Sequence, residues 1–143
     1  MATTAGKLAG ETAIVTAAGQ GLGEEISKRF ALEGANIAVA DINEAEAQRV
    51  AGEINAAGGS AIALKCDATK KSEVTAMVDT VLKKWGTVDI LINAAGGFHQ
   101  FAPITEITTK STNDMDRIPN ASATARAIIA NAKRTLTDAW ARV

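Results

Sequence analysis

The stretch Thr12-Ala-Ile-Val-Thr-Ala-Ala-Gly-Gln-Gly-Leu-Gly23 decides the fold, because it joins a short apolar run to a turn that contains three glycines. Leu22, Ile26 and Phe30 then recur every four residues, so they lie on one face of a helix that ends at Gly34. At the start of such a helix the backbone N–H groups are unpaired and the helix dipole is positive, which stabilises an anion. A glycine-rich turn between a strand and a helix is typical of a site for the pyrophosphate of a dinucleotide.

The same alternation of apolar runs and helical patterns extends from Glu11 to Gly97. Three further strands are predicted over residues 36–40, 61–65 and 88–92. Apolar side chains at helical spacing mark two more helices, one with Ala47, Val50, Ile54 and Ala57 and one with Val74, Met77, Val78, Val81, Leu82 and Trp85. Strands and helices in this order predict an α/β fold, a Rossmann-like three-layer sandwich in which helices cover both faces of a parallel sheet.

The alternation stops after Gly97. Residues 98–121 contain Pro103, Pro119 and many small polar residues, so we expect irregular structure there. Residues 122–142 carry an apolar stripe at helical spacing and predict one long C-terminal helix. We therefore expect a single dinucleotide-binding domain over residues 1–143, with its nucleotide-binding core at residues 8–97.

Two acidic residues and one run of small residues follow the later strands. Asp41 comes about twenty residues after the glycines, where a carboxylate can accept hydrogen bonds from both ribose hydroxyls of the adenosine and repel a 2′-phosphate. This position favours NAD(H) over NADP(H); the alternative role for Asp41 is to cap the helix that follows. Asp67 can bind an adenine amino group or cap the third helix. Residues 93–96 leave room for a flat ribose or ring, or form a plain strand-ending turn.

Composition and charge exclude several other classes of protein. With 15 basic and 16 acidic residues and no basic stretch, the chain is not expected to bind nucleic acid. Its apolar runs are too short to span a membrane and its start has no apolar signal core, so we expect a cytoplasmic protein. The single cysteine, Cys66, cannot form an internal disulfide. No grouping of His, Cys and carboxylates predicts a metal site.

Taken together, four motifs resemble the short-chain dehydrogenase/reductase family: Thr16-Ala-Ala-Gly-Gln-Gly-Leu-Gly23, Asp41, Cys66-Asp67 and Asn93-Ala-Ala-Gly96. The resemblance extends over residues 8 to about 106. Against the family patterns Thr-Gly-x-x-x-Gly-x-Gly and Asn-Asn-Ala-Gly, Ala17 replaces the first glycine and Ala94 the second asparagine. The resemblance implies an NAD cofactor, hydride transfer between a small carbonyl or alcohol substrate and that cofactor, and these cofactor-binding residues: Ala17, Gly19, Gln20, Gly21, Leu22, Gly23, Asp41, Ile42, Asp67, Ala68, Asn93, Ala94, Ala95 and Gly96.

The family's catalytic pair, Tyr-x-x-x-Lys, is not found in this sequence, which contains no tyrosine. That tyrosine exchanges a proton with the substrate oxygen, and the lysine lowers its pKa. Residues 125–141 resemble the helix that carries the pair, which places Ser122 and Arg126 at the two positions; the alternative is an unrelated amphipathic helix. His99 can do acid–base work or be an exposed loop histidine. We therefore expect an oxidoreductase that is impaired or inactive, or else a non-catalytic dinucleotide-binding or oligomerising module.

The resemblance also implies how the strands are arranged. The family's strand order places the four predicted strands as 3-2-1-4, with residues 88–92 at an edge. An apolar edge strand invites pairing with a second chain, so we expect a homodimer or a larger homo-oligomer.

Overall fold

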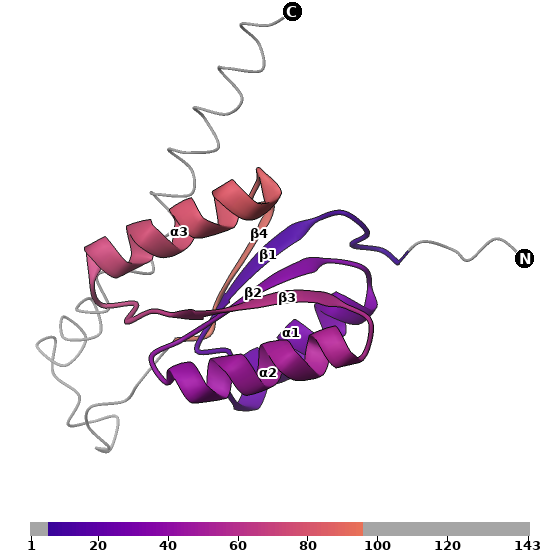
Figure 1. Ribbon diagram of the computed structural model, residues 1–143, viewed down its shortest axis with the longest axis horizontal. Coiled ribbons are helices and arrows are strands. Elements are labelled where there is room, and N and C mark those ends of the chain that lie inside the picture. The colour runs from indigo at the N-terminus through magenta and orange to yellow at the C-terminus, as the bar shows by residue number, and fades with distance from the viewer. Residues whose placement is uncertain (1–5, 96–143) are drawn as a thin grey trace, which may run out of the picture.

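The computed structural model describes residues 6–95, which form a parallel four-stranded sheet with three helices (Figure 1). The elements alternate along the chain as β1 (Thr12–Thr16), α1 (Gly21–Leu32), β2 (Asn36–Asp41), α2 (Glu44–Ala56), β3 (Ser60–Lys65), α3 (Lys71–Trp85) and β4 (Ile90–Asn93). The strand order is β3-β2-β1-β4 and every pairing is parallel, which confirms the predicted fold and order. The predicted irregular segment at 98–121 and helix at 122–142 lie outside the described residues.

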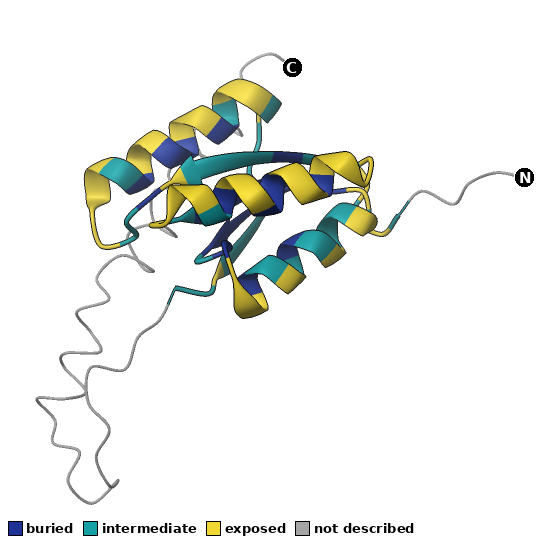
Figure 2. Cartoon of the chain, turned by 60° about the horizontal axis from the view of Figure 1, so that its bottom comes forward, coloured by how far each residue is buried: buried dark blue, intermediate teal, exposed yellow. Residues whose placement is uncertain are grey.

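The helices form a layer on each side of the sheet: α1 and α2 cover one face and α3 covers the other (Figure 1). Side chains alternate along β1, so Ala13 and Val15 pack in the cluster with α2, while Ile14 packs against α3 with Val74 and Val78. All five residues of β1 are buried, because the strand has a neighbour on each side and helices on both faces. Figure 2 colours the chain by burial, and the buried residues lie along the strands and on one side of each helix.

Two of the predicted helical faces are confirmed. Ala47, Val50 and Ile54 are buried on α2, while the predicted Ala57 is exposed just after its end. The buried residues of α3 are Val74, Met77, Val78 and Val81. Helix α3 ends in a left-handed turn at Gly86, with φ 81° and ψ −15°, whose N–H donates to the Leu82 carbonyl. None of the helices within residues 6–95 is long and apolar enough to cross a membrane.

The inner face of α1 differs from the predicted one. Of the predicted residues, Phe30 packs against the core, but Leu22 is 73% exposed, and the buried positions of this helix are Gly23 and Ser27. The hydroxyl of Ser27 donates to the Gly23 carbonyl at 2.7 Å, so this small polar residue is satisfied within the helix. Small residues let the first turn of α1 lie close to the strand ends, and this close approach turns Leu22 outward.

The edge strands are shifted from their predicted bounds, since β3 begins at Ser60 and β4 covers Ile90–Asn93 rather than residues 88–92. Asp89 precedes β4 and fixes its entry, because its N–H donates to the Thr12 carbonyl at 2.9 Å. The Asp89 carboxylate also accepts from the Thr12 N–H at 2.8 Å and from the Thr87 hydroxyl at 2.9 Å. The predicted strand was too long at its start because an apolar run does not reveal where ladder hydrogen bonds begin.

Candidate nucleotide-binding site

The carboxyl ends of all four strands meet at one edge of the sheet, because the strands are parallel. Thr16 at the end of β1 lies beside Ala40 of β2 on one side and Asn93 of β4 on the other. The chain leaves β1 for β2 on one side and later returns from β3 to β4 on the other, so a topological switch point lies at the end of β1. Open α/β sheets bind their ligands in the crevice at such a point.

Each glycine of the turn between β1 and α1 has its own structural reason. Gly21 has φ 59°, a left-handed conformation that other residues rarely adopt. A Cβ on Gly23 would lie 2.4 Å from the Ala17 carbonyl oxygen, and a Cβ on Gly19 would lie 3.0 Å from the Asp41 carboxylate. A side chain at Gly19 or Gly23 would therefore force a neighbouring group to move, and one at Gly21 would strain the backbone.

The start of α1 is open to an anion. Gln20 is the N-cap residue and its side chain makes no capping hydrogen bond, so no side chain covers the N–H groups of the first turn. Gln20, Gly21 and Leu22 are all exposed, so the approach from solvent is clear in the described part of the chain. These free donors and the positive end of the helix dipole suit a phosphate.

Ala17 departs from the family pattern at a position where the backbone prefers glycine. Its φ is 50°, the one positive φ of a non-glycine residue within residues 6–95. The left-handed conformation costs an L-residue about 1–2 kcal/mol. The side chain of Ala17, which is half-buried, therefore adds local strain to the turn.

Asp41, at the end of β2, faces the glycine-rich turn. Its Oδ2 accepts a hydrogen bond from the Gly19 N–H at 2.9 Å, and its Oδ1 accepts from the Asn43 N–H at 2.9 Å. The N-cap residue of α2 is Asn43, so the alternative in which Asp41 caps that helix is wrong. A carboxylate has about four acceptor positions, so Asp41 keeps capacity for further hydroxyl donors. Ile42, beside it, exposes 64% of its surface.

Asp67 follows β3 and is held by a local turn. Its Oδ1 accepts from both the N–H and the hydroxyl of Thr69, at 2.9 and 2.7 Å. These hydrogen bonds, with help from Lys70, hold the pKa of the Asp67 carboxyl below its usual range. The N-cap residue of α3 is Lys70, so the alternative in which Asp67 caps that helix is also wrong. Asp67 is ionised and half-buried beside Ala68, where it can accept a hydrogen bond from a ligand.

Cys66 precedes Asp67 and faces inward. It is 5% exposed and packs in the core cluster against α3. Burial, with added repulsion from Glu73 and Asp67, raises the pKa of the Cys66 thiol to about 11. The thiol is therefore neutral at physiological pH and is a packing residue.

The segment after β4 is tied to β1. The hydroxyl of Thr16 donates to the Ile92 carbonyl at 3.4 Å and accepts from the Ala95 N–H at 3.3 Å. Both hydrogen bonds are long, and they connect the end of β1 to the end of β4 and to the residues that follow it. Ala94 and Ala95 are half-buried and Asn93 is exposed, so small side chains border the crevice here.

Four predicted site residues lie outside the described range: Gly96, His99, Ser122 and Arg126. Within residues 6–95 no group of three or more His, Cys, Asp or Glu side chains is placed to hold a metal ion.

Sequence reasoning missed a set of charged residues that surrounds the glycine-rich turn. The guanidinium of Arg49, on α2, donates to the Gly19 carbonyl at 2.9 Å. It also pairs with Glu24 at 3.0 Å, and with Glu46 and Glu53 at 2.8 Å each. The spacing of Glu46, Arg49 and Glu53 along α2 is a visible helical pairing pattern, but nothing in the sequence indicates the contacts from Arg49 to Gly19 and Glu24.

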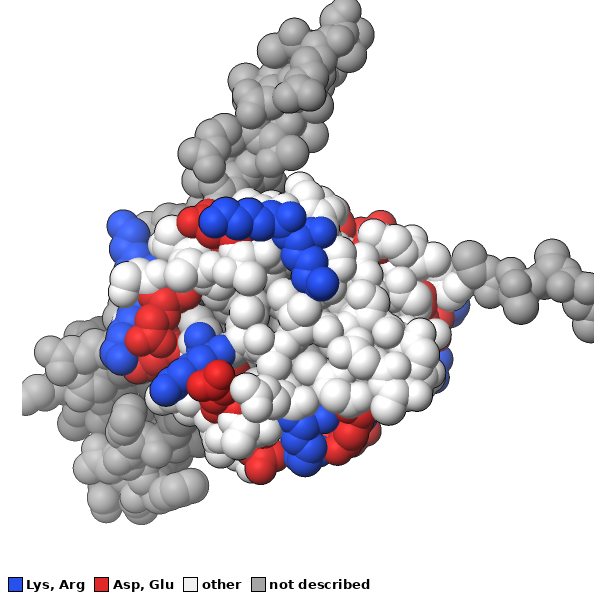
Figure 3. All heavy atoms as spheres, in the orientation of Figure 1, with Lys and Arg blue, Asp and Glu red and all other residues white. Residues whose placement is uncertain are grey.

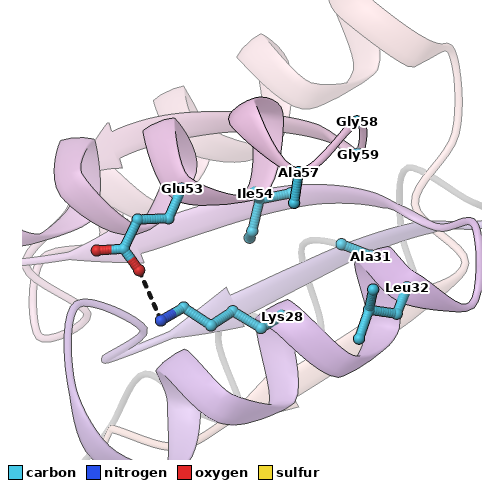
Figure 4. Close-up of a pocket in the computed structure, with 8 residues that line it drawn as sticks. All are labelled: Lys28, Ala31, Leu32, Glu53, Ile54, Ala57, Gly58 and Gly59. Carbon is cyan, nitrogen blue, oxygen red and sulfur yellow. Dashed lines mark ion pairs between the residues drawn. The ribbon is translucent and has the colours of Figure 1, made fainter.

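A separate cavity of about 380 Å³ lies between the carboxyl-terminal halves of α1 and α2 (Figure 4). Its lining includes Ala31, Leu32 and Ile54, and the ion pair between Lys28 and Glu53, at 2.6 Å, lies at one end. These helix halves lead into β2 and β3, so the cavity lies toward the amino ends of the strands and outside the candidate site.

On the face in Figure 3, basic and acidic groups lie next to one another around a broad uncharged area.

Comparison with known proteins agrees with this architecture. The model of a family described as short chain dehydrogenase matches residues 11–133. A 7alpha-hydroxysteroid dehydrogenase of Escherichia coli (strain K12) is 47% identical over 91 residues, which cover 64% of this chain and 36% of that protein. Sorbitol dehydrogenase of Cereibacter sphaeroides is 37% identical over 134 residues, which cover 89% of this chain and 50% of that protein.

Solved structures give the same result. A 7 alpha-hydroxysteroid dehydrogenase complexed with NADH and 7-oxo glycochenodeoxycholic acid superposes with a TM-score of 0.75 at 36% identity, covering 85% of this chain and 48% of that one. The chain thus spans between 36% and 50% of the length of the two curated relatives named above. The match to the family model, the motifs and the sheet order agree, and the chain belongs to the short-chain dehydrogenase family of oxidoreductases.

Proposed function

We propose that this chain binds NAD(H) at the carboxyl edge of its sheet, as the cofactor of an oxidoreductase that acts on a carbonyl or alcohol. The observation that carries this proposal is the position of Asp41, whose carboxylate joins the end of β2 to the turn at Gly19. This contact supports the proposal because it brings a carboxylate that can accept ribose hydroxyls next to a turn that can accept a phosphate. The solved NADH complex of a 36% identical family member supports the same choice of cofactor.

In this proposal, different residues bind the pyrophosphate, the adenosine ribose and the adenine. Gly19, Gly21 and Gly23 bring the pyrophosphate to the N-terminus of α1. Asp41 accepts the hydroxyls of the adenosine ribose. Asp67 accepts a hydrogen bond from the adenine amino group.

The other proposed contacts come from mostly small or apolar residues, together with Gln20 and Asn93. Ile42 and Ala68 flank the adenine, while Ala17, Gln20 and Leu22 line the turn at the pyrophosphate. Asn93, Ala94, Ala95 and Gly96 border the second ribose. NAD supplies the hydride acceptor when it is bound, and the chain's own residues bind and orient it.

A preference for NAD over NADP follows from the charge of Asp41. A 2′-phosphate would approach a carboxylate that is half-buried and already fixed by two backbone N–H groups. Two like charges at close range destabilise the complex, and the hydroxyls of NAD supply donors instead.

Turnover by these 143 residues alone is proposed to be weak or absent, because the sequence contains no tyrosine to exchange a proton with a substrate oxygen. Ser122 and Arg126 stand at the family's Tyr and Lys positions in our alignment. A serine hydroxyl needs an adjacent base to act, and an arginine stays protonated. His99 is the one histidine available as a substitute proton donor.

Calorimetric titration of the purified protein with NAD⁺ and NADH tests the proposal, with NADP⁺ as the comparison. Saturable binding of NAD(H) that is tighter than that of NADP⁺ is the expected result. Absence of binding at millimolar NAD(H) would overturn the proposal together with every cofactor assignment. A screen of alcohols and carbonyls, read by NADH absorbance, then measures turnover.

The second function that we propose is self-association through β4. We also propose that the protein is cytoplasmic. Within residues 6–95, β4 pairs with β1 alone, and its residues Ile90, Leu91 and Ile92 are only half-buried. An apolar strand with one free side is suited to pairing with another copy. Sedimentation at micromolar concentration is expected to give a dimer or larger assembly, and a strict monomer would contradict this second proposal.

A further inference from the structure

The peptide units on the two sides of Gly19 are held by opposite charges. On one side, the Gly19 N–H donates to the Asp41 carboxylate at 2.9 Å. On the other, the Gly19 carbonyl accepts from Arg49 Nη2, also at 2.9 Å. Gly19 is buried, so these two charge-assisted contacts fix the direction of the turn where it leaves β1 and approaches α1.

Arg49 reaches the turn from a neighbouring element. It projects from the middle of α2, and its guanidinium spans the gap between α2 and the first turn of α1. Glu46 and Glu53, one turn before and one turn after it on α2, hold two other donors at 2.8 Å each. These two carboxylates keep the planar guanidinium in one orientation. A lysine ammonium at this position could not make the same set of directed hydrogen bonds.

The partner of Arg49 on α1 is an acidic residue close to the proposed pyrophosphate site. Glu24 lies in the first turn of α1, and its side chain is only 14% exposed. Arg49 donates to both carboxylate oxygens of Glu24 at 3.0 Å each, and Lys28 also donates to Oε1 at 2.6 Å. A negative charge in this turn opposes a bound phosphate, so its neutralisation matters to any anion at this helix end.

The ion-pair network continues across the two helices. Lys28 bridges Glu24 and Glu53 at 2.6 Å each, so the same α1–α2 interface carries a second cation (Figure 4). Hydrogen bonds from Arg49 and Lys28 lower the pKa of the Glu24 carboxyl to about 2. Glu24 is therefore charged at any physiological pH, and its field at the helix end depends on these two cations.

We infer that Arg49 is a positioning residue of the dinucleotide site, which holds the Gly19 carbonyl in place and cancels the Glu24 charge so that the N-terminus of α1 accepts a pyrophosphate. The inference rests on the proposed function and extends it to a residue that need not touch the ligand. It assigns two separable effects to one side chain, one geometric at Gly19 and one electrostatic at Glu24.

Three variants separate the two effects. Arg49→Met removes the charge and the hydrogen bonds but keeps the apolar stem. The double variant Arg49→Met with Glu24→Gln also removes the Glu24 carboxylate, which would otherwise keep Lys28 as its one cationic partner among the described residues. Arg29→Met is the matched control, since Arg29 pairs with Glu33 at the far end of α1, outside the site.

Titrations with NADH and with adenosine, followed by NMR, give the readout. Arg49→Met is expected to weaken NADH binding about tenfold, equivalent to about 1.4 kcal/mol, and to change adenosine binding by less than about twofold, because adenosine carries no phosphate. The double variant is expected to regain a large part of the NADH affinity, and the Arg29→Met control to bind like the parent. Equal losses for NADH and adenosine, or no recovery in the double variant, would overturn the inference.

Amide hydrogen exchange of the unliganded protein keeps the test independent of cofactor binding. Arg49→Met should speed exchange of the Gly19 N–H by more than about tenfold while amides of α3 stay unchanged. If the parent protein does not bind NADH at all, the proposed function fails by itself, and the exchange result still decides whether Arg49 holds the turn. Unchanged exchange at Gly19 would show that Arg49 does not position it.

Discussion

The carboxylate of Asp41 and the backbone N–H of Gly19, 22 residues apart in the chain, are joined by a hydrogen bond of 2.9 Å. Asp41 thus supports the glycine-rich turn, in addition to its proposed role as the acceptor of ribose hydroxyls. A hydrogen bond to a charged group contributes about 1.5–3 kcal/mol. The same residue is therefore expected to affect cofactor affinity through both the ligand and the turn.

Asp41→Ala is expected to weaken NADH binding about tenfold to a hundredfold, because both the ribose contact and the hold on Gly19 are lost. NADP⁺ binding should weaken less, since the repulsion of the 2′-phosphate disappears at the same time. Calorimetric titration measures both affinities. Asp79→Ala, which removes an exposed carboxylate of α3, is the control, and equal losses for Asp41→Ala and Asp79→Ala would contradict the assignment.

Gly23→Ala is expected to destabilise the protein by about 1–3 kcal/mol, because its Cβ would lie 2.4 Å from the Ala17 carbonyl oxygen and force the turn or α1 to move. Gly52→Ala is the matched comparison, since nothing lies within 4 Å of a Cβ at that helical position. It should stabilise α2 by about 0.5–1 kcal/mol through helix propensity. Urea unfolding of both variants should give changes of opposite sign, and changes of the same sign would contradict the packing at Gly23.

Ala17→Gly is expected to stabilise the protein by about 0.5–1 kcal/mol, because glycine adopts φ 50° without the strain that alanine carries. The gain is reduced by the greater backbone freedom of glycine in the unfolded chain. Ala18→Gly, at the next and fully buried position, should instead destabilise through loss of a packed methyl group. Thermal unfolding distinguishes the two, and a less stable Ala17→Gly variant would show that the turn is unstrained at this position.

Glu24 gives the protein a pH-dependent contribution to stability. Its pKa is about 2 in the folded state against 4.5 as a free side chain, so the folded state favours the ionised form. This contribution is fully present above about pH 4.5 and is lost as the pH falls toward 2. Allowing for solvent screening, Glu24→Gln should cost about 1 kcal/mol at pH 7.

Urea unfolding at pH 7 and at pH 3 measures this contribution. The difference in free energy of unfolding between the parent and Glu24→Gln should be clearly smaller at pH 3, where the free side chain is mostly protonated. Glu25→Gln, which removes a charge from the exposed neighbouring position, is the control. A parent-to-variant difference that stays constant between the two pH values would contradict the ion-pair account of Glu24.

The parts of the fold that depend on local pattern could be predicted from the sequence. The face of α3 was predicted because Val74, Met77 and Val81 repeat at helical spacing over several turns. Leu22 fits the same spacing on α1 yet is exposed, because contact with the strand ends selects the small residues Gly23 and Ser27. Periodicity identifies an apolar face but does not show how closely a helix approaches its sheet.

The candidate site could be predicted only where a motif marks it. The sequence indicated the glycine-rich turn, Asp41 and Asp67 as candidates because each lies at or just after the end of a strand, and parallel strands bring their ends together. Arg49 was missed because its contact to Gly19 joins residues 30 positions apart and depends on how α2 lies against α1. Neither this contact nor the ion pair between Arg49 and Glu24 produces a local spacing that the sequence could show.

The most direct test of the central claim is an NMR titration of ¹⁵N-labelled protein with NADH. If the carboxyl edge of the sheet binds the dinucleotide, saturable shifts should appear at the amides of Gly19, Gly21, Asp41 and Asp67. The amides of Gly58 and Gly59, in the cavity between α1 and α2, should stay unchanged. Shifts centred on Gly58 and Gly59, or no saturable shifts at millimolar NADH, would contradict the claim that this edge is the cofactor site.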